Sequence, residues 1–127
     1  MTKILIPVSL GELYDKISIL EIKKLYIKES RKLENISREY DYLQEILSKQ
    51  NNFDTELYKL LKNINHKLWE VEDNIRIKEN KKEFDNQFIE PARTVYQLND
   101  ERALVKQKIS LKYNSEIVEE KSYEKYN

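Results

Sequence analysis

Apolar side chains recur at intervals of three and four residues along most of the chain, which is the spacing of the buried face of an α-helix. One series comprises Leu33, Ile36, Tyr40, Leu43 and Leu47, and another comprises Leu57, Leu61, Ile64, Leu68, Val71 and Ile75. Both series keep the heptad rhythm of helices that pack side by side. The pattern predicts an all-α protein whose main feature is a long, coiled-coil-like antiparallel hairpin.

The first helix of this hairpin is expected over residues 9–50. Ser9 and Glu12 form a capping box at its start, because the serine can cap a free backbone N–H while the glutamate reaches back. A charged run at 28–32 separates two apolar series that are out of phase, so the helix either continues through this run or kinks there. Residues 1–8 contain β-branched side chains and a proline, and they are expected to form a short extended arm.

Two further helices follow within the same single domain of 127 residues. The second is expected over residues 54–80, after a short loop. The third is expected over residues 88–113, because Pro91 is tolerated in the first turn of a helix. Residues 114–127 are expected to form a C-terminal tail. The predicted architecture is therefore a hairpin plus a third helix, flanked by an arm and a tail.

The composition supports this fold class and excludes several kinds of site. One glycine and two prolines are too few turn residues for a β-sandwich, a barrel or a Rossmann-like sheet, and one glycine cannot make a glycine-rich phosphate loop. The absence of cysteine excludes disulfides and a cysteine nucleophile, and a single histidine excludes a multi-histidine zinc site. We therefore expect no cofactor, with magnesium only under an enzymatic alternative.

The charge balance and the hydropathy of the chain indicate its cellular location and its class of partner. The 23 basic and 23 acidic side chains balance, whereas a general nucleic-acid-binding protein usually carries a basic excess. No apolar run approaches the roughly 18 residues needed to span a bilayer, and no signal peptide is visible. We expect a cytoplasmic protein whose partner is neither a membrane nor a nucleic acid.

The lengths of the predicted helices indicate a second subunit. A helix over 54–80 that folds back on 9–50 is too short to cover it, because each residue adds only about 1.5 Å. The apolar segment 10–22 would then overhang, and such a surface must be covered. The third helix, the tail, a kink or a second copy could cover it. We expect a homodimer, with a different protein as the alternative partner.

The densest polar group in the second helix could hold a divalent cation. Glu70 and Asp73 lie three residues apart and share a helix face. With Glu12 and Asp15 they partly resemble the paired acidic motifs with which all-α nucleoside-triphosphate pyrophosphohydrolases bind magnesium, although the gap between the two pairs is longer here. The alternative without a metal is a solvent-exposed helix face on which charged side chains such as Asp73 and Arg76 form ion pairs.

A second polar group lies in the third helix. Arg93, Tyr96 and Asp100 share one face of it. Asn99 and Arg102 occupy positions at which the apolar series of the helix would continue. Polar residues at such positions either fix the register of helix packing or line a ligand pocket. The end of this helix is basic and the tail is acidic, so the tail is expected to dock on it.

Short blocks scattered over most of the chain carry a resemblance. They are residues 7–13, 15–17 and 19–23, Leu68–Trp69 with Glu72–Asp73, residues 88–90 with 92–93, residues 95–96 with 99–100, and residues 119–123. Together they resemble a family of short, uncharacterised bacterial and phage helical proteins that is known only as a domain of unknown function. The resemblance implies the cytoplasm of a bacterial cell or a phage-infected host cell, and an accessory role in surface-sugar synthesis as one alternative. It assigns no activity and no catalytic residue.

These observations favour a non-enzymatic helical module for protein interaction or oligomerisation. The enzymatic alternative is a magnesium-dependent, pyrophosphohydrolase-like protein, which would require several of the carboxylates to converge. The candidate binding residues are Glu12, Asp15, Trp69, Glu70, Asp73, Arg76, Arg93, Tyr96, Asn99 and Asp100. No catalytic residue and no metal ligand is assigned in the favoured interpretation.

Overall fold

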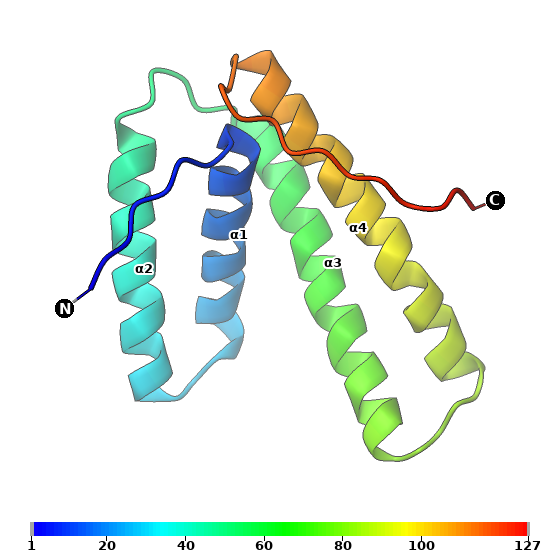
Figure 1. Cartoon of the computed structure of the whole chain (residues 1–127). Coiled ribbons are helices and arrows are strands. Elements are labelled where there is room, and N and C mark those ends of the chain that lie inside the picture. The colour runs from blue at the N-terminus through cyan, green and yellow to red at the C-terminus, as the bar shows by residue number, and fades with distance from the viewer. Residues whose placement is uncertain (1, 127) are drawn as a thin grey trace.

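The computed structural model describes residues 2–126, which form four α-helices and no strand (Figure 1). The helices are α1 (Leu10–Tyr26), α2 (Ser30–Ser48), α3 (Thr55–Asn80) and α4 (Asn86–Lys112). The all-α prediction is confirmed. Met1 and Asn127, the outermost residues of the predicted arm and tail, lie outside the described residues. No helix in the described part of the chain is long and apolar enough to cross a membrane.

The prediction of one helix over 9–50 is wrong, because the chain turns back on itself between α1 and α2. Ile27 and Glu29 both have extended backbone, with ψ angles of 128° and 123°. The charged run that follows supplies no apolar side chain that could hold a continuous helix against the core. The alternative of a kink at 28–32 is closer to the structure, in which α1 and α2 form a short antiparallel hairpin (Figure 1).

A second, longer hairpin is formed by α3 and α4. The predicted antiparallel pairing of 9–50 with 54–80 is also wrong, because α2 makes no close backbone contact with α3 in the described chain and α1 runs parallel to α3 (Figure 1). α1 packs against α2 on one side and against α3 and α4 on the other (Figure 1). Among the described helices, α2 makes close backbone contact with α1 alone. Four helices with α1 at their centre therefore replace the predicted hairpin plus third helix.

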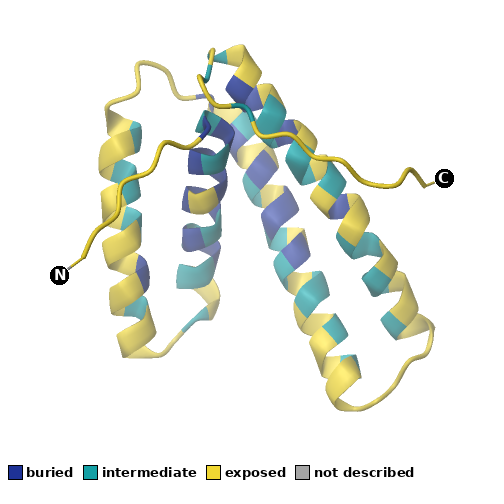
Figure 2. Cartoon of the chain, in the orientation of Figure 1, coloured by how far each residue is buried: buried dark blue, intermediate teal, exposed yellow. Residues whose placement is uncertain are grey.

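The central position of α1 explains its wide apolar surface. Its buried apolar side chains, each at most 5% exposed, are Leu13, Tyr14, Ile17, Leu20 and Ile22. Figure 2 shows that buried positions recur along the length of α1. They occupy more than one face, as expected of a helix with neighbours on several sides. The prediction that segment 10–22 overhangs the second helix is wrong, because the break at 27–29 allows α1 to lie along α3.

The apolar series predicted for the second helix forms the inner face of α3. Leu61, Ile64 and Leu68 are buried in one cluster with the apolar residues of α1. α4 adds Leu98 and Ile109 to the same cluster. Burying one such side chain contributes about 1.5–3 kcal/mol. This cluster is therefore a main source of stability.

Three serine hydroxyls accept hydrogen bonds from the first three backbone N–H groups of α1. Ser9 caps the third N–H at 3.1 Å, as the capping box predicts. Ser110 of α4 accepts from the second N–H, and Ser115 of the tail accepts from the first, both at 3.0 Å. These N–H groups have no partner within a helix. Serines from distant parts of the chain thus satisfy the buried start of α1.

The single glycine, Gly11, allows α1 to approach the backbone of α4. A Cβ atom at this position would lie 2.2 Å from the carbonyl oxygen of Lys106. No side-chain rearrangement could relieve that contact, because the obstructing atom belongs to the backbone. The two helices can therefore reach their observed separation only with glycine here.

We expect Gly11→Ala to lower the free energy of unfolding by about 2–4 kcal/mol, measured by urea denaturation, because the two helices must move apart. Glu101→Ala on the exposed face of α4 is the control and should change stability by less than about 0.5 kcal/mol. Alanine is the better helix former by about 1 kcal/mol. A Gly11→Ala variant as stable as the wild type would therefore contradict the close contact.

Asp54 joins the start of α3 to two other helices. Its carboxylate accepts hydrogen bonds from the Leu57 N–H at 3.0 Å, from Lys112 at 2.5 Å and from the Tyr113 hydroxyl at 2.8 Å. Its own N–H donates to the hydroxyl of Tyr14 on α1 at 2.9 Å. These contacts, and above all the hydrogen bond from Lys112, lower the pKa of the Asp54 carboxyl to about 2.

Asp54 should make the protein less stable as the pH falls from about 5 to about 2. Its pKa is about 2 in the folded state, against an ordinary 3.8, so the unfolded state binds the proton first and is favoured by acid. Asp54→Asn keeps an oxygen that can cap α3 and should flatten this part of the curve of unfolding free energy against pH. Glu56→Gln, an exposed neighbour, is the control, and equal flattening in both variants would contradict the assignment.

Candidate functional site

A network of buried polar side chains is organised around Asp15 of α1. Its side chain is 2% exposed. One carboxylate oxygen accepts from the Asn65 amide at 2.8 Å and from Nε of Arg102 at 2.9 Å. The other accepts from a terminal nitrogen of Arg102 at 2.5 Å, and the same Asn65 amide donates to Ser18 at 2.8 Å. The two-point ion pair fixes α1 to α4, and the amide fixes α1 to α3.

Two opposing effects act on the pKa of the Asp15 carboxyl. Burial alone would raise the pKa, because it disfavours the charged form. Hydrogen bonds from Arg102 and Asn65 outweigh burial and hold the pKa below its ordinary value. The hydrogen bond with Asp15 likewise raises the pKa of Arg102. Both partners are therefore charged at neutral pH, and neither is poised to exchange a proton.

Lys106 forms a second layer of this network. Its ammonium lies 2.7 Å from Glu12, 3.7 Å from Asp15 and 3.8 Å from Glu119 of the tail. Glu119 also pairs with Lys121 at 2.9 Å. The acidic tail therefore docks on α4, as the sequence predicts.

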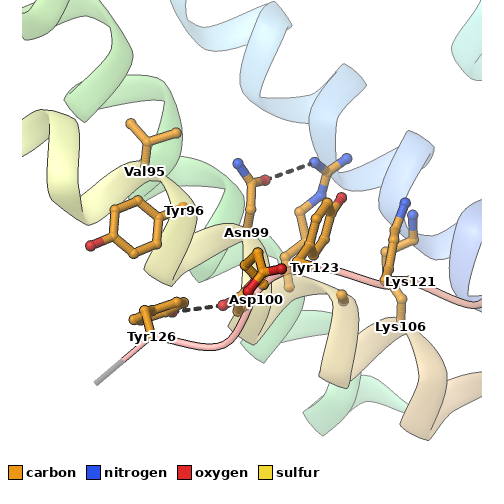
Figure 3. Close-up of a pocket in the computed structure, with 11 residues that line it drawn as sticks. Val95, Tyr96, Asn99, Asp100, Lys106, Lys121, Tyr123 and Tyr126 are labelled. Carbon is orange, nitrogen blue, oxygen red and sulfur yellow. Dashed lines mark hydrogen bonds between the residues drawn. The ribbon is translucent and has the colours of Figure 1, made fainter.

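Two hollows share Asn99 and Arg102 as lining residues. The tail hollow, of about 600 Å³, lies between α4 and the tail. Its lining also includes Tyr96, Asp100, Tyr123, Glu124 and Tyr126 (Figure 3). The helix hollow, of about 520 Å³, draws its lining from α1, α3 and α4. Its lining also includes Ile19, Asn65, Trp69, Asp73 and Arg76.

The structure places most of the predicted site residues around Arg102. They are Glu12 and Asp15 in the buried network, Trp69, Asp73 and Arg76 at the helix hollow, Tyr96 and Asp100 at the tail hollow, and Asn99 at both. Glu70 and Arg93 lie outside this group and are exposed. Each is near a residue of its own helix, Glu70 at 3.6 Å from His66 and Arg93 at 3.4 Å from Glu90.

The carboxylates considered for magnesium do not converge. Within residues 2–126, no three histidine, cysteine or acidic side chains are placed to hold a metal ion. Glu12 and Asp15 face basic side chains instead, and Asp73 lies apart from them at the helix hollow. Arg76 pairs with Glu72 at 2.7 Å rather than with Asp73. The arrangement that a pyrophosphohydrolase-like magnesium site would need is therefore not present in the described chain.

Several members of this group were not predicted as site residues. Asn65 and Ser18 are polar residues on faces that pack against neighbouring helices, and they are at most 5% exposed. Arg102 was recognised only as a polar residue at an apolar position. Polar residues at positions where the apolar pattern expects a buried side chain are the only sign of this network in the sequence. The partner of each could not be read from the sequence, because the pairs are separated by 47 to 87 residues.

Trp69 occupies the edge of the helix hollow and stacks on an aromatic ring of α1. Its ring centroid lies 5.3 Å from that of Tyr26, and the two planes differ by 24°. The Tyr26 hydroxyl in turn lies 2.6 Å from Nε2 of His66. The indole N–H of Trp69 is buried and has no hydrogen-bond partner among residues 2–126. The end of α1 is thus held to α3 by aromatic contacts.

A separate apolar surface lies at the N-terminal arm, which crosses α2 in Figure 1. Ile4 and Leu5 are each 78% exposed and Ile6 is 69% exposed. With Tyr42 and Ile46 of α2, also exposed, they line a third hollow of about 590 Å³. We call these five residues the arm surface. Residues 2–8 make no backbone hydrogen bond within the described chain.

These features define a four-helix protein built around a buried ionic network. The chain belongs to the Family of unknown function (DUF6165), which matches residues 4–126. The predicted membership of a family that is known only as a domain of unknown function is confirmed, while the bacterial or phage source stays a prediction. No curated protein and no solved structure matches the chain.

We expect Asp15→Asn to lower the free energy of unfolding by roughly 2–4 kcal/mol, because it leaves the partly buried Arg102 without its ionic partner. Asp73→Asn makes the same chemical change at an exposed position and should cost less than about 0.5 kcal/mol. Urea denaturation at neutral pH measures both. Equal effects in the two variants would show that the network does not hold α1 against α4.

Proposed function

We propose that this protein is a non-enzymatic interaction module that self-associates through the arm surface, with a second copy of the chain as the partner. The observation that carries the proposal is an arm whose apolar side chains are largely exposed and whose backbone makes no hydrogen bond within the described chain. As part of the same proposal, the protein acts in the cytoplasm.

The apolar character of the arm surface supports an interface. Single exposed leucines or isoleucines are common on proteins and need no explanation. Here five exposed apolar residues instead line the same hollow. Contiguous exposed apolar surface marks contact sites, because covering it releases ordered water. The arm surface therefore suits a protein partner better than a small polar ligand.

The backbone of the arm supports a second copy as that partner. Extended segments with free N–H and C=O groups associate by pairing with another strand. Two arms related by a two-fold axis can pair antiparallel over residues 3–6, because Pro7 lacks an N–H and ends the ladder. Each arm would then present its apolar side chains to the hollow of the other copy.

The pairing of charges in the buried network supports a structural role for it. Asp15, Arg102 and Lys106 each already contact an oppositely charged side chain. A catalytic acid or base must be able to exchange a proton near neutral pH, and a strongly paired carboxylate and guanidinium are poorly suited to this. Interaction is therefore the function that the geometry supports best.

Sedimentation equilibrium tests the proposal. We expect the wild type to reach a dimer as its concentration rises through the micromolar range, and the double variant Ile4→Asp, Ile6→Asp to remain monomeric. Charges in the arm would be buried without partners in the dimer. The melting temperature of the monomer should hardly change, because the arm is exposed.

Leu104→Asp is the matched control, since Leu104 is 67% exposed on α4 and lies away from the arm surface. It should leave the dimer intact. A wild type that stays monomeric at high micromolar concentration would refute self-association. If the Leu104→Asp variant dissociates as much as the arm variant does, the interface is not specific to the arm surface.

A further inference from the structure

We propose that the tail hollow binds an organic ammonium group, such as a quaternary or methylated amine. This site is distinct from the arm surface and independent of self-association. Three features of the hollow carry the inference: its aromatic walls, its balance of charges and the way its central carboxylate is held.

The aromatic walls are the side chains of Tyr96, Tyr123 and Tyr126. The rings of Tyr96 and Tyr126 lie with centroids 4.6 Å apart and planes at 87°. In Figure 3 these two rings come from α4 and from the tail, and Tyr123 of the tail lines the same hollow. Aromatic faces attract cations within about 6 Å, and clusters of such rings recognise quaternary ammonium ligands.

The charges around the hollow leave a local excess of carboxylate. Its three cationic side chains, Arg102, Lys106 and Lys121, each pair with a carboxylate of the neighbouring network. Asp100 and Glu124 also line the hollow, and neither makes an ion pair with any described residue. These two uncompensated carboxylates line the same hollow as the three tyrosines. A cation is therefore attracted here and an anion is repelled.

A hydrogen bond holds the central carboxylate beside the rings. The Tyr126 hydroxyl donates to Asp100 at 2.6 Å (Figure 3). This hydrogen bond, together with partial burial and the negative charge of Asp100, raises the pKa of Tyr126 to about 12. The tyrosine therefore remains neutral at physiological pH. Its ring offers a π face while its hydroxyl orients the carboxylate.

The chemistry of the lining selects among cations. A compact metal ion requires several converging oxygen ligands, and within residues 2–126 no group of three such side chains is placed for one. A methylated ammonium is larger and weakly hydrated, and it gains from aromatic faces rather than from directed oxygen ligands. The hollow of about 600 Å³ has room for such a group.

Titration with tetramethylammonium chloride, followed by NMR of protein labelled with ¹³C in its tyrosine rings, tests this site. We expect saturable shifts of the Tyr96, Tyr123 and Tyr126 signals, and no comparable shifts with sodium chloride at equal ionic strength. Tyr123→Leu should weaken binding at least about fivefold, since it removes one cation–π contact. Asp100→Asn should weaken it by a similar factor.

Phe84→Leu, which removes an exposed aromatic ring from the loop between α3 and α4, is the matched control and should bind tetramethylammonium as the wild type does. Tyr123 is 72% exposed, so Tyr123→Leu should leave the fold intact. Weaker binding in this variant would therefore not result from unfolding. Sedimentation of the Tyr123→Leu variant should match that of the wild type, which separates failure of this site from failure of self-association.

Choline and a peptide carrying trimethyllysine distinguish a free small molecule from a protein-borne group as the source of the ammonium. Tighter binding of either probe than of unmodified lysine amide supports the site. Unchanged binding in both Tyr123→Leu and Asp100→Asn would overturn the proposal. Absence of saturable shifts, or preferential shifts of the same tyrosines by inorganic phosphate, would also overturn it.

Discussion

The contact of α1 with α4 at Gly11 sets the register on which the other long-range interactions depend. Because the two helices run antiparallel, one turn forward on α1 from Gly11 is Asp15, and one turn back on α4 from Lys106 is Arg102. The close backbone contact therefore brings the carboxylate and the guanidinium opposite each other. An ion pair buried in this way costs desolvation energy, and it is favourable only when its geometry is held by the surrounding fold.

The buried network separates an interior whose charges are balanced from a surface whose charges are not. Inside, each carboxylate faces an amide, a guanidinium or an ammonium, so the helices can meet only in one register. Outside, the tail contributes Glu119 to this balance, while Glu124 near its end makes no ion pair with any residue of the range 2–126. The same tail thus completes the structure at one end and forms a chemically open surface at the other.

The sequence predicted the helical class and the inner face of α3 because both follow from periodicity, which is a local property. The capping role of Ser9 was predictable for the same reason. The break at 27–29 was not, since it contains neither glycine nor proline and its charged residues are good helix formers. Its cause is the gain from packing α1 between α2 and α3, which no local pattern records. Asn65 and Arg102 were likewise visible only as polar interruptions, because their partner belongs to another helix.

The serine caps of α1 have a consequence for how the chain folds. Two of their three hydrogen bonds join residues that are 99 and 105 positions apart in the sequence, which is most of the length of the chain. During synthesis α1 emerges first, and α2 and α3 can cover it next, but its first two N–H groups have no serine partner until α4 and the start of the tail have been made. Contacts of this span carry a large loop-closure entropy, so the chain should fold more slowly than helical bundles held by neighbours in sequence. The first helix to be synthesised is therefore among the last to reach its native surroundings.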